Sequence, residues 1–175
     1  MNEQLILDVL DRIRGRYYGK YRGTVTDVEP PGRGRIKATV PAVLGDQQTG
    51  WCDPCVPYAG NNVGIAFLPK KGAGVWIEFE GGDVSYPIWS GCYWRDGEVP
   101  RKVAEGVMVI RTESGHEIVL DDNGQSVTIT DANGNSIMLQ GGGITLQAAN
   151  GGGKVELTDA EVNINDGNLE VQVGP

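Results

Sequence analysis

Apolar and polar residues follow two different patterns along the 175-residue chain. Near the N-terminus, apolar residues recur at helical spacing and polar residues occupy the opposite side. This pattern predicts one amphipathic helix over residues 1–14, with an apolar side formed by Ile6, Val9, Leu10 and Ile13. A helix of under four turns is marginal unless that side is packed. We therefore expect it to dock on the rest of the chain or on a partner.

Residues 15–94 alternate short β-favouring runs with turn residues. Turn chemistry is clearest at Gly60-Asn61-Asn62 and Gly81-Gly82-Asp83. The strands expected between the turns span residues 21–28, 35–40, 63–68, 75–79 and 87–93. Five short strands with a long connection over residues 41–62 are typical of a small closed barrel of the OB-fold type, and closure removes exposed strand edges. The expected fold class is therefore all-β.

Residues 95–106 form a polar segment that we interpret as a linker, and beyond it the pattern becomes simpler. Over residues 107–175, apolar residues recur at i, i+2 and are separated by Gly, Asn and Asp, which is the period of a strand with one apolar face. These residues are Val107, Val109, Ile118, Leu120, Val127, Ile129, Ile137, Leu139, Ile144, Leu146, Val155, Leu157, Val162, Ile164, Leu169, Val171 and Val173. The pattern predicts a stalk of short strands.

The apolar face of this stalk needs a cover. Fully burying one aliphatic side chain contributes roughly 1.5–3 kcal/mol, so the uncovered face favours association. Either the chain coils on itself as a solenoid or several chains share one axis. Successive pairs are spaced by 11, 9, 10, 7, 11, 7 and 7 residues, whereas solenoids keep a near-constant period. We therefore favour a homotrimer with an intertwined triple-stranded β-helix, in which strands pair with those of neighbouring chains.

In that arrangement a defined set of residues faces the trimer axis. It comprises Val109, Ile118, Leu120, Val127, Ile129, Ile137, Leu139, Ile144, Leu146, Val155, Leu157, Val162, Ile164, Leu169 and Val171.

Composition separates the same two parts of the chain. All twelve aromatic residues lie between Tyr17 and Trp94. Residues 1–105 hold 13 acidic and 13 basic side chains, whereas residues 106–175 hold 10 acidic side chains and only Arg111 and Lys154. The net charge of −8 therefore resides in the tail, which argues against a nucleic-acid or anionic-membrane partner for it. Because no signal pattern or long apolar run is present, we expect synthesis and assembly in the cytoplasm.

Residues that could carry chemistry are sparse. Cys52 and Cys55 form a Cys-x-x-Cys pair, but only Cys92 and His116 remain to complete four zinc ligands. His116 also has no nucleophile at a recognisable motif spacing. The acidic turn at residues 121–124 lacks the downstream glutamate of an EF-hand, and the glycine triplets lack the Lys-Ser or Lys-Thr of a phosphate loop. We expect no catalytic residue, no metal site, no cofactor and no enzymatic activity.

Two segments carry a family resemblance. One is the strand Pro87-Ile88-Trp89-Ser90-Gly91-Cys92-Tyr93, and the more specific one is Ser114-Gly115-His116-Glu117-Ile118-Val119-Leu120-Asp121-Asp122, followed by Thr128-Ile129-Thr130-Asp131 and Gly134-Asn135-Ser136-Ile137. Over residues 15–173 the chain resembles the spike proteins of contractile injection systems. These are phage baseplate assembly protein V, the valine-glycine repeat protein of type VI secretion, and the spikes of phage-tail-like particles.

The resemblance implies a homotrimer at the centre of a baseplate. Its barrels would contact a separate hub protein, and its β-helix would be driven through the target envelope by sheath contraction. The expected hub contact is the apolar side of the N-terminal helix, Ile6, Val9, Leu10 and Ile13. The His-x-His iron site of some phage spikes is missing, which implies a separate conical tip protein with Pro-Ala-Ala-Arg repeats. Its expected contact residues are Leu169, Val171 and Val173.

Two alternatives remain open from the sequence. The four tryptophans of the barrel could form a stacking platform for an oligosaccharide or single-stranded nucleic acid, which would make the chain an OB-type binding module with a β-solenoid tail. A trimeric receptor-binding fibre would share the stalk but normally has a distal head, and the chain ends at Pro175 without one.

Overall fold

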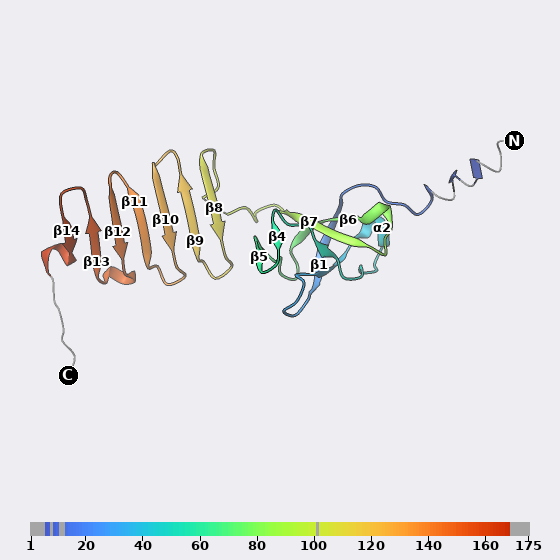
Figure 1. The fold of residues 1–175 in the computed structure, drawn as a ribbon, viewed down its shortest axis with the longest axis horizontal. Coiled ribbons are helices and arrows are strands. Elements are labelled where there is room, and N and C mark those ends of the chain that lie inside the picture. Colours follow the sequence, from blue (N-terminus) through green and yellow to red (C-terminus); the bar gives the residue numbers. More distant parts are fainter. Residues whose placement is uncertain (1–5, 8, 11–12, 101, 169–175) are drawn as a thin grey trace. The chain divides into compact units, whose positions relative to one another are not determined.

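The computed structural model describes residues 6–7, 9–10, 13–100 and 102–168. Two compact units divide the chain, the barrel unit over residues 1–98 and the stalk unit over residues 99–175 (Figure 1). Residues 6–7, 9–10 and 13 are helical, as the N-terminal pattern predicts. Within the described part of the chain, no helix is long and apolar enough to cross a membrane.

The barrel unit is built on one five-stranded sheet with the order β2-β1-β6-β7-β3. Its strands are β1 (Tyr21–Val28), β2 (Ile36–Thr39), β3 (Asp53–Pro54), β6 (Gly74–Phe79) and β7 (Pro87–Tyr93), and the short helix α2 (Pro41–Leu44) follows β2. All neighbours are antiparallel except β3 and β7. The segment 48–54 also forms bridges to Ile36 and Thr39 of β2. It therefore joins the two edges of the sheet, and the sheet closes as an OB-like barrel.

Alternation along the strands produces the barrel core. On β6, Val75, Ile77 and Phe79 are buried, while the alternate residues Trp76 and Glu78 are half-buried. The buried core consists of Val25, Ile36, Ala38, Val40, Cys52, Val75, Ile77, Phe79 and Trp89. Tyr17 and Tyr21 pack on Phe79 with ring centroids 6.2 and 5.9 Å away. Gly74 keeps β6 close to β7, since a Cβ there would lie 2.9 Å from the Tyr93 carbonyl oxygen.

The strand expected over residues 63–68 is not part of the barrel. Only Val63–Gly64 is extended, as β5, and it pairs with β4 (Ala59–Gly60) in a separate two-stranded hairpin. The fifth place in the sheet belongs to β3, which lies within the predicted long connection. β-Propensity measures how well a residue fits a pleated, half-buried surface, and it does not specify which sheet the residue joins.

The stalk unit is a seven-stranded antiparallel sheet in simple sequence order, β8 to β14 (Figure 1). The strands are β8 (Val107–Arg111), β9 (Glu117–Asp121), β10 (Ser126–Thr130), β11 (Ser136–Gln140), β12 (Gly143–Gln147), β13 (Lys154–Leu157) and β14 (Val162–Ile164). Short 3-10 turns η1 (Glu80–Gly82), η2 (Ala149–Gly151) and η3 (Asn165–Gly167) complete the described elements. The expected all-β class and the division into barrel and β-stalk are confirmed.

The backbone pairing in the stalk differs in detail from the expectation. Each described strand pairs with its sequence neighbours in the same chain, so these ladders are not shared with neighbouring chains. Short turns, such as Gly141-Gly142 between β11 and β12, place consecutive strands side by side. The sheet is also a single layer, whereas the alternative single-chain solenoid requires the described strands to coil over one another.

Ile77 offers a direct test of the barrel core, because its side chain is fully buried. We expect Ile77→Ala to lower the free energy of unfolding of the barrel unit by about 2–5 kcal/mol through lost burial and a residual cavity. Urea unfolding followed by tryptophan fluorescence measures this unit alone, since all four tryptophans lie in it. The control Tyr86→Ala, at an exposed side chain, should change it by about 0.5 kcal/mol or less. Equal effects of the two changes would refute this core.

Candidate subunit interface on the stalk

One face of the stalk sheet is apolar along its whole described length. The register sets Ile129 opposite both Ile118 and Ile137, and Leu139 opposite Ile144. The pairing aligns two side chains from each strand, and we call the resulting surface the apolar face. It consists of Met108, Ile110, Ile118, Leu120, Val127, Ile129, Ile137, Leu139, Ile144, Leu146, Val155, Leu157, Val162 and Ile164.

This apolar face is only half covered in a single chain. The side chains shield one another across strands, yet Ile129, Ile137 and Leu146 still expose 43%, 40% and 40% of their surface. Contiguous exposed apolar patches of this extent mark interaction surfaces in soluble proteins. Removing the remaining exposed part of each side chain from water contributes on the order of 1 kcal/mol. The face therefore has the geometry and the driving force of an interface.

Most of the predicted axis residues lie on this apolar face, but the first strand is a correction. On β8, Met108 and Ile110 pair with Leu120 and Ile118, whereas Val109 pairs with Val119 on the opposite face. The four consecutive apolar residues 107–110 give no alternation from which the correct face could be read. Leu169, Val171 and Val173 lie outside the described residues.

The opposite face of the stalk is mostly polar, and acidic residues at the ends of the strands hold the turns. Asp131 accepts backbone N–H groups from Asn133 and Asn135, each at 2.9 Å. The side chain of Asn135 also donates to Asp131, and this hydrogen bond holds the pKa of the carboxyl below its usual value. Asp121 likewise accepts the N–H of Gly124 at 2.9 Å. Among the described residues, no cluster of three or more His, Cys, Asp or Glu side chains could bind a metal ion.

His116 has a structural position in the same set of turns. Its Nδ1 atom accepts the backbone N–H of Ala132 at 3.2 Å, which ties the β8–β9 turn to the β10–β11 turn. Its own N–H donates to the Thr112 hydroxyl at 3.0 Å. These contacts agree with the interpretation of His116 as a turn residue.

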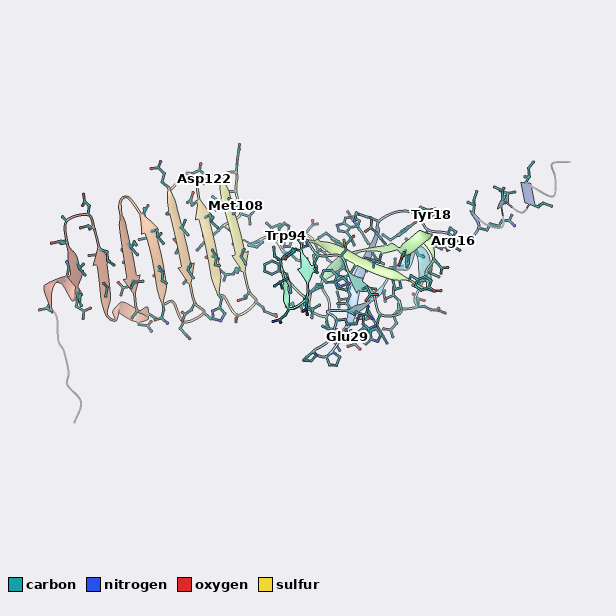
Figure 2. All side chains as sticks on the ribbon, in the orientation of Figure 1. Arg16, Tyr18, Glu29, Trp94, Met108 and Asp122 are labelled. Carbon is teal, nitrogen blue, oxygen red and sulfur yellow. The ribbon has the colours of Figure 1, made fainter. Side chains whose placement is uncertain are left out.

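Residues 102–106 pack against the first strands of the stalk unit, although the sequence suggests a linker over residues 95–106. The carbonyl of Gly106 accepts the N–H of Asp122 at 2.9 Å, and the carbonyl of Glu105 accepts the Asn123 side chain at 2.8 Å. Lys102 reaches from this segment to the carboxylate of Glu117. We call residues 102–106 the collar. Asp122 and Met108 mark this end of the stalk sheet in Figure 2.

Glu117 is a buried carboxylate with two cationic partners. Its side chain is 5% exposed, with one oxygen on Lys102 and the other 2.5 Å from Arg111 Nη1. The Lys102 hydrogen bond and then the Arg111 hydrogen bond hold the pKa of Glu117 below its usual value, against the opposing effect of burial. A buried charge is costly unless it is paired. Glu117 therefore depends on the collar. The burial of Glu117 was not predicted from the sequence. The available signal was Val119, an apolar residue two positions further along the same, mostly polar face.

The tryptophans of the barrel do not form an open stacking platform. Trp89 is buried, and its Nε1–H donates to the Gly34 carbonyl at 3.1 Å. Lys37 Nζ lies over the ring of Trp51, 4.8 Å from the ring centroid. The Arg22 guanidinium lies over the ring of Trp76, 5.6 Å from the ring centroid. Only Trp94 exposes most of its surface. Cation–π contacts within the chain thus occupy ring faces that a base or sugar would need.

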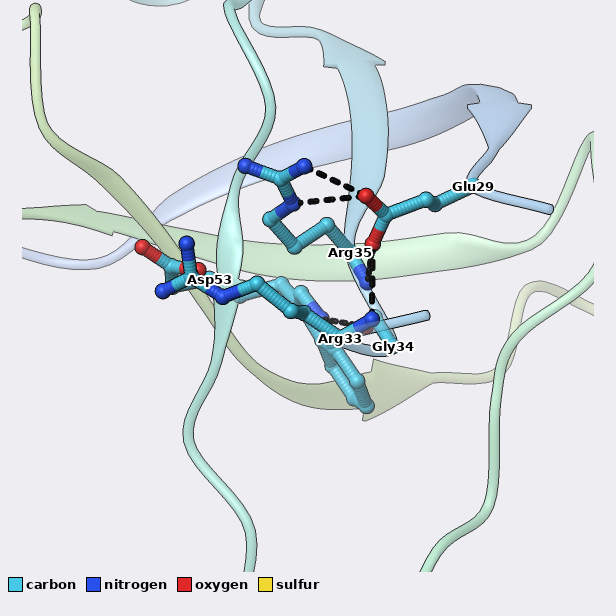
Figure 3. Close-up of polar contacts among 6 residues, drawn as sticks. Glu29, Arg33, Gly34, Arg35 and Asp53 are labelled. Atoms are coloured by element: carbon cyan, nitrogen blue, oxygen red, sulfur yellow. Dashed lines mark hydrogen bonds and ion pairs between the residues drawn. The ribbon is translucent and has the colours of Figure 1, made fainter. Parts of the chain in front are cut away.

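The turn that carries Gly34 is fixed by Glu29 (Figure 3). One carboxylate oxygen accepts the N–H groups of Arg33 and Arg35 at 3.1 and 3.3 Å, and the other pairs with the Arg35 guanidinium. This pairing with Arg35 lowers the pKa of Glu29 to about 2. The turn and its charges are thus engaged within the barrel.

The remaining candidate residues precede the stalk in the sequence. They are the three cysteines and the apolar side chains of the N-terminal helix. Cys52 is buried, and burial raises the pKa of its thiol to about 11, while Cys55 and Cys92 are exposed free thiols. In the N-terminal helix, the apolar residues proposed as a hub contact all have exposed side chains, and they are Ile6, Val9, Leu10 and Ile13.

Two family models match the chain in the order of its two parts. Residues 21–94 match the injector OB domain of type VI secretion systems and phage baseplates. Residues 107–170 match the phage baseplate V C-terminal trimerisation domain. A search of curated proteins found no match. The second match covers all the described strands that carry the apolar face.

The Glu117 contacts predict a pH effect on stalk stability. Because the folded pKa of Glu117 lies below the ordinary value of 4.5, its stabilising contribution is present above that value and is lost as pH falls through the folded pKa. The melting temperature of the unmodified chain should therefore fall as the Glu117 carboxylate is protonated, and we call this fall the acid-induced step. We expect Glu117→Gln to lower the melting temperature at neutral pH and to remove this step. Melting curves from circular dichroism across this pH range test both effects.

The matched control for this prediction is Glu161→Gln, which changes an exposed carboxylate of the same unit. It should leave the acid-induced step in place. A Glu117→Gln protein with the same melting profile as the unmodified chain would show that the pairing of Glu117 with Lys102 and Arg111 does not stabilise the stalk.

Proposed function

Because this chain belongs to the baseplate V spike family of phage tails and type VI secretion systems, we propose that three copies form the central spike of a contractile injection baseplate. The observation that carries the proposal is the half-covered apolar face, which extends through every strand of the stalk sheet. The match of this segment to a trimerisation domain supports three chains as the cover.

In the proposed trimer, three apolar faces meet around one axis. Each chain keeps its own hydrogen-bonded sheet, so association buries side chains without leaving ladder groups unpaired. The polar faces and the acidic turns then point to solvent, which places the net negative charge of the stalk on its outer surface. Separating the chains would expose the whole axis at once, so the stalk is expected to be stiff and to dissociate cooperatively.

We propose that this stiffness serves puncture of the target envelope when the sheath contracts. The function then follows from shape and rigidity, and no reactive group is needed. The exposed apolar side of the N-terminal helix, which includes Leu10 and Ile13, supports contact with a separate hub protein. A conical tip protein would bind at the C-terminal end, at residues beyond those the structure describes. The chain would be made in the cytoplasm and then incorporated into the baseplate.

The position of Ile129 on the apolar face supplies the sharpest test. Ile129→Asp places three carboxylates against one another at the axis, where like charges in a low-dielectric setting repel strongly. We expect this variant to sediment mainly as a monomer and to lose heat resistance. Sedimentation velocity at several concentrations measures the distribution of species.

Thr128→Asp is the matched control, because the neighbouring residue on β10 faces the opposite side, where it pairs with Val119 and Met138. It should remain trimeric. If Ile129→Asp also remains trimeric and equally heat-resistant, the apolar face is not the subunit interface.

A further inference from the structure

A second exposed apolar surface lies in the barrel unit. The hairpin around β4 and β5 carries two aromatic and three aliphatic side chains with large exposed fractions, including 65% for Phe67 and 58% for Tyr58. We call this surface the hairpin patch, and it consists of Tyr58, Val63, Ile65, Phe67 and Leu68. Single exposed apolar side chains are normal on a protein surface, but five large ones within eleven residues are typical of an interaction site.

The backbone of the hairpin is well defined although its side chains are uncovered. Ile65 N–H donates to the Tyr58 carbonyl at 3.0 Å, and Ala59 pairs with Gly64. Gly64 permits a close crossing, since a Cβ there would lie 2.8 Å from the Tyr58 carbonyl oxygen. Two-stranded hairpins are marginal in water unless an apolar side packs on another surface. The hairpin therefore needs a cover for its apolar side chains.

The hairpin also encloses part of a cavity of about 320 Å³. Pro54, Val56 and Trp89 line it from the barrel, and Tyr58, Val63 and Phe67 line it from the hairpin. Such a concave apolar surface with aromatic side chains at its border suits an inserted apolar or aromatic side chain.

We propose that a second copy of this chain covers the hairpin patch, so that neighbouring barrels in the spike trimer contact one another through it. This inference rests on the proposed trimer. Trimers of cyclic symmetry use head-to-tail contacts, in which one surface meets a different surface of the next copy. The cavity accordingly receives side chains from another part of the neighbouring barrel.

The tether between the two units favours a second copy as the occupant. Residues 94–106 separate β7 from β8, and even fully extended they span at most about 45 Å. Three stalks joined at their apolar faces therefore hold three barrels at a high local concentration, at which a weak contact becomes occupied. Residues 1–105 carry equal numbers of acidic and basic side chains, so no net repulsion opposes this approach.

A photocrosslinking experiment on the full chain tests the contact. A benzophenone amino acid replaces Phe67 in one protein and Tyr86, which is similarly exposed, in another. Light scattering first establishes the mass of each protein before irradiation. We expect illumination of the position-67 protein to give covalent dimers and trimers on a denaturing gel, with cross-linked peptides from the barrel unit, at least several-fold more than at position 86.

The outcomes separate the two proposals. A trimer by mass that gives no interchain product at position 67, or equal yields at both positions, overturns the barrel contact and leaves the trimeric stalk intact. A monomer by mass overturns the trimer and the barrel contact together.

Discussion

The constraint on which the stalk depends is the alignment of apolar side chains on one face of a single-layer sheet. A shift of one residue in any strand would move its apolar pair to the polar face, because side chains alternate strictly along a strand. The turns prevent such a shift. Asp131 and Asp121 accept turn N–H groups, and His116 links the β8–β9 turn to the β10–β11 turn, so polar side chains that look dispensable maintain the register. The acidic character of the stalk is therefore partly structural.

At the beginning of the stalk, the collar stabilises the first strands of the sheet. There the face opposite the apolar face holds buried Val119 and the buried carboxylate of Glu117, and Lys102 of the collar pairs with that carboxylate, while backbone hydrogen bonds join the collar to the β9–β10 turn. The polar segment between the parts is thus structured where it meets β8 and β9. In the barrel, residues 48–54 have a comparable role, because they bridge both edges of the sheet and close it.

The sequence was informative where a period was unbroken. Strands 21–28 and 87–93 and the apolar pairs from Ile118 to Ile164 follow from alternation and turn residues alone. The sequence-based prediction was wrong where the apolar residues do not alternate with polar ones. In the run 107–110, all four residues are apolar, so the pattern does not indicate which side chains lie on the apolar face. In the apolar run 63–68, the first two residues form a hairpin strand instead of a barrel strand. The pairing of Glu117 depends on residues brought together by folding, so no local pattern announces it.

The most direct measurement is the absolute mass of the purified full chain by light scattering, at several concentrations and in moderate denaturant. We expect three times the 18.7 kDa chain mass, independent of concentration and resistant to denaturant, because three apolar faces form one buried axis. A stable monomer would contradict it, since the apolar face would then persist in water without a partner.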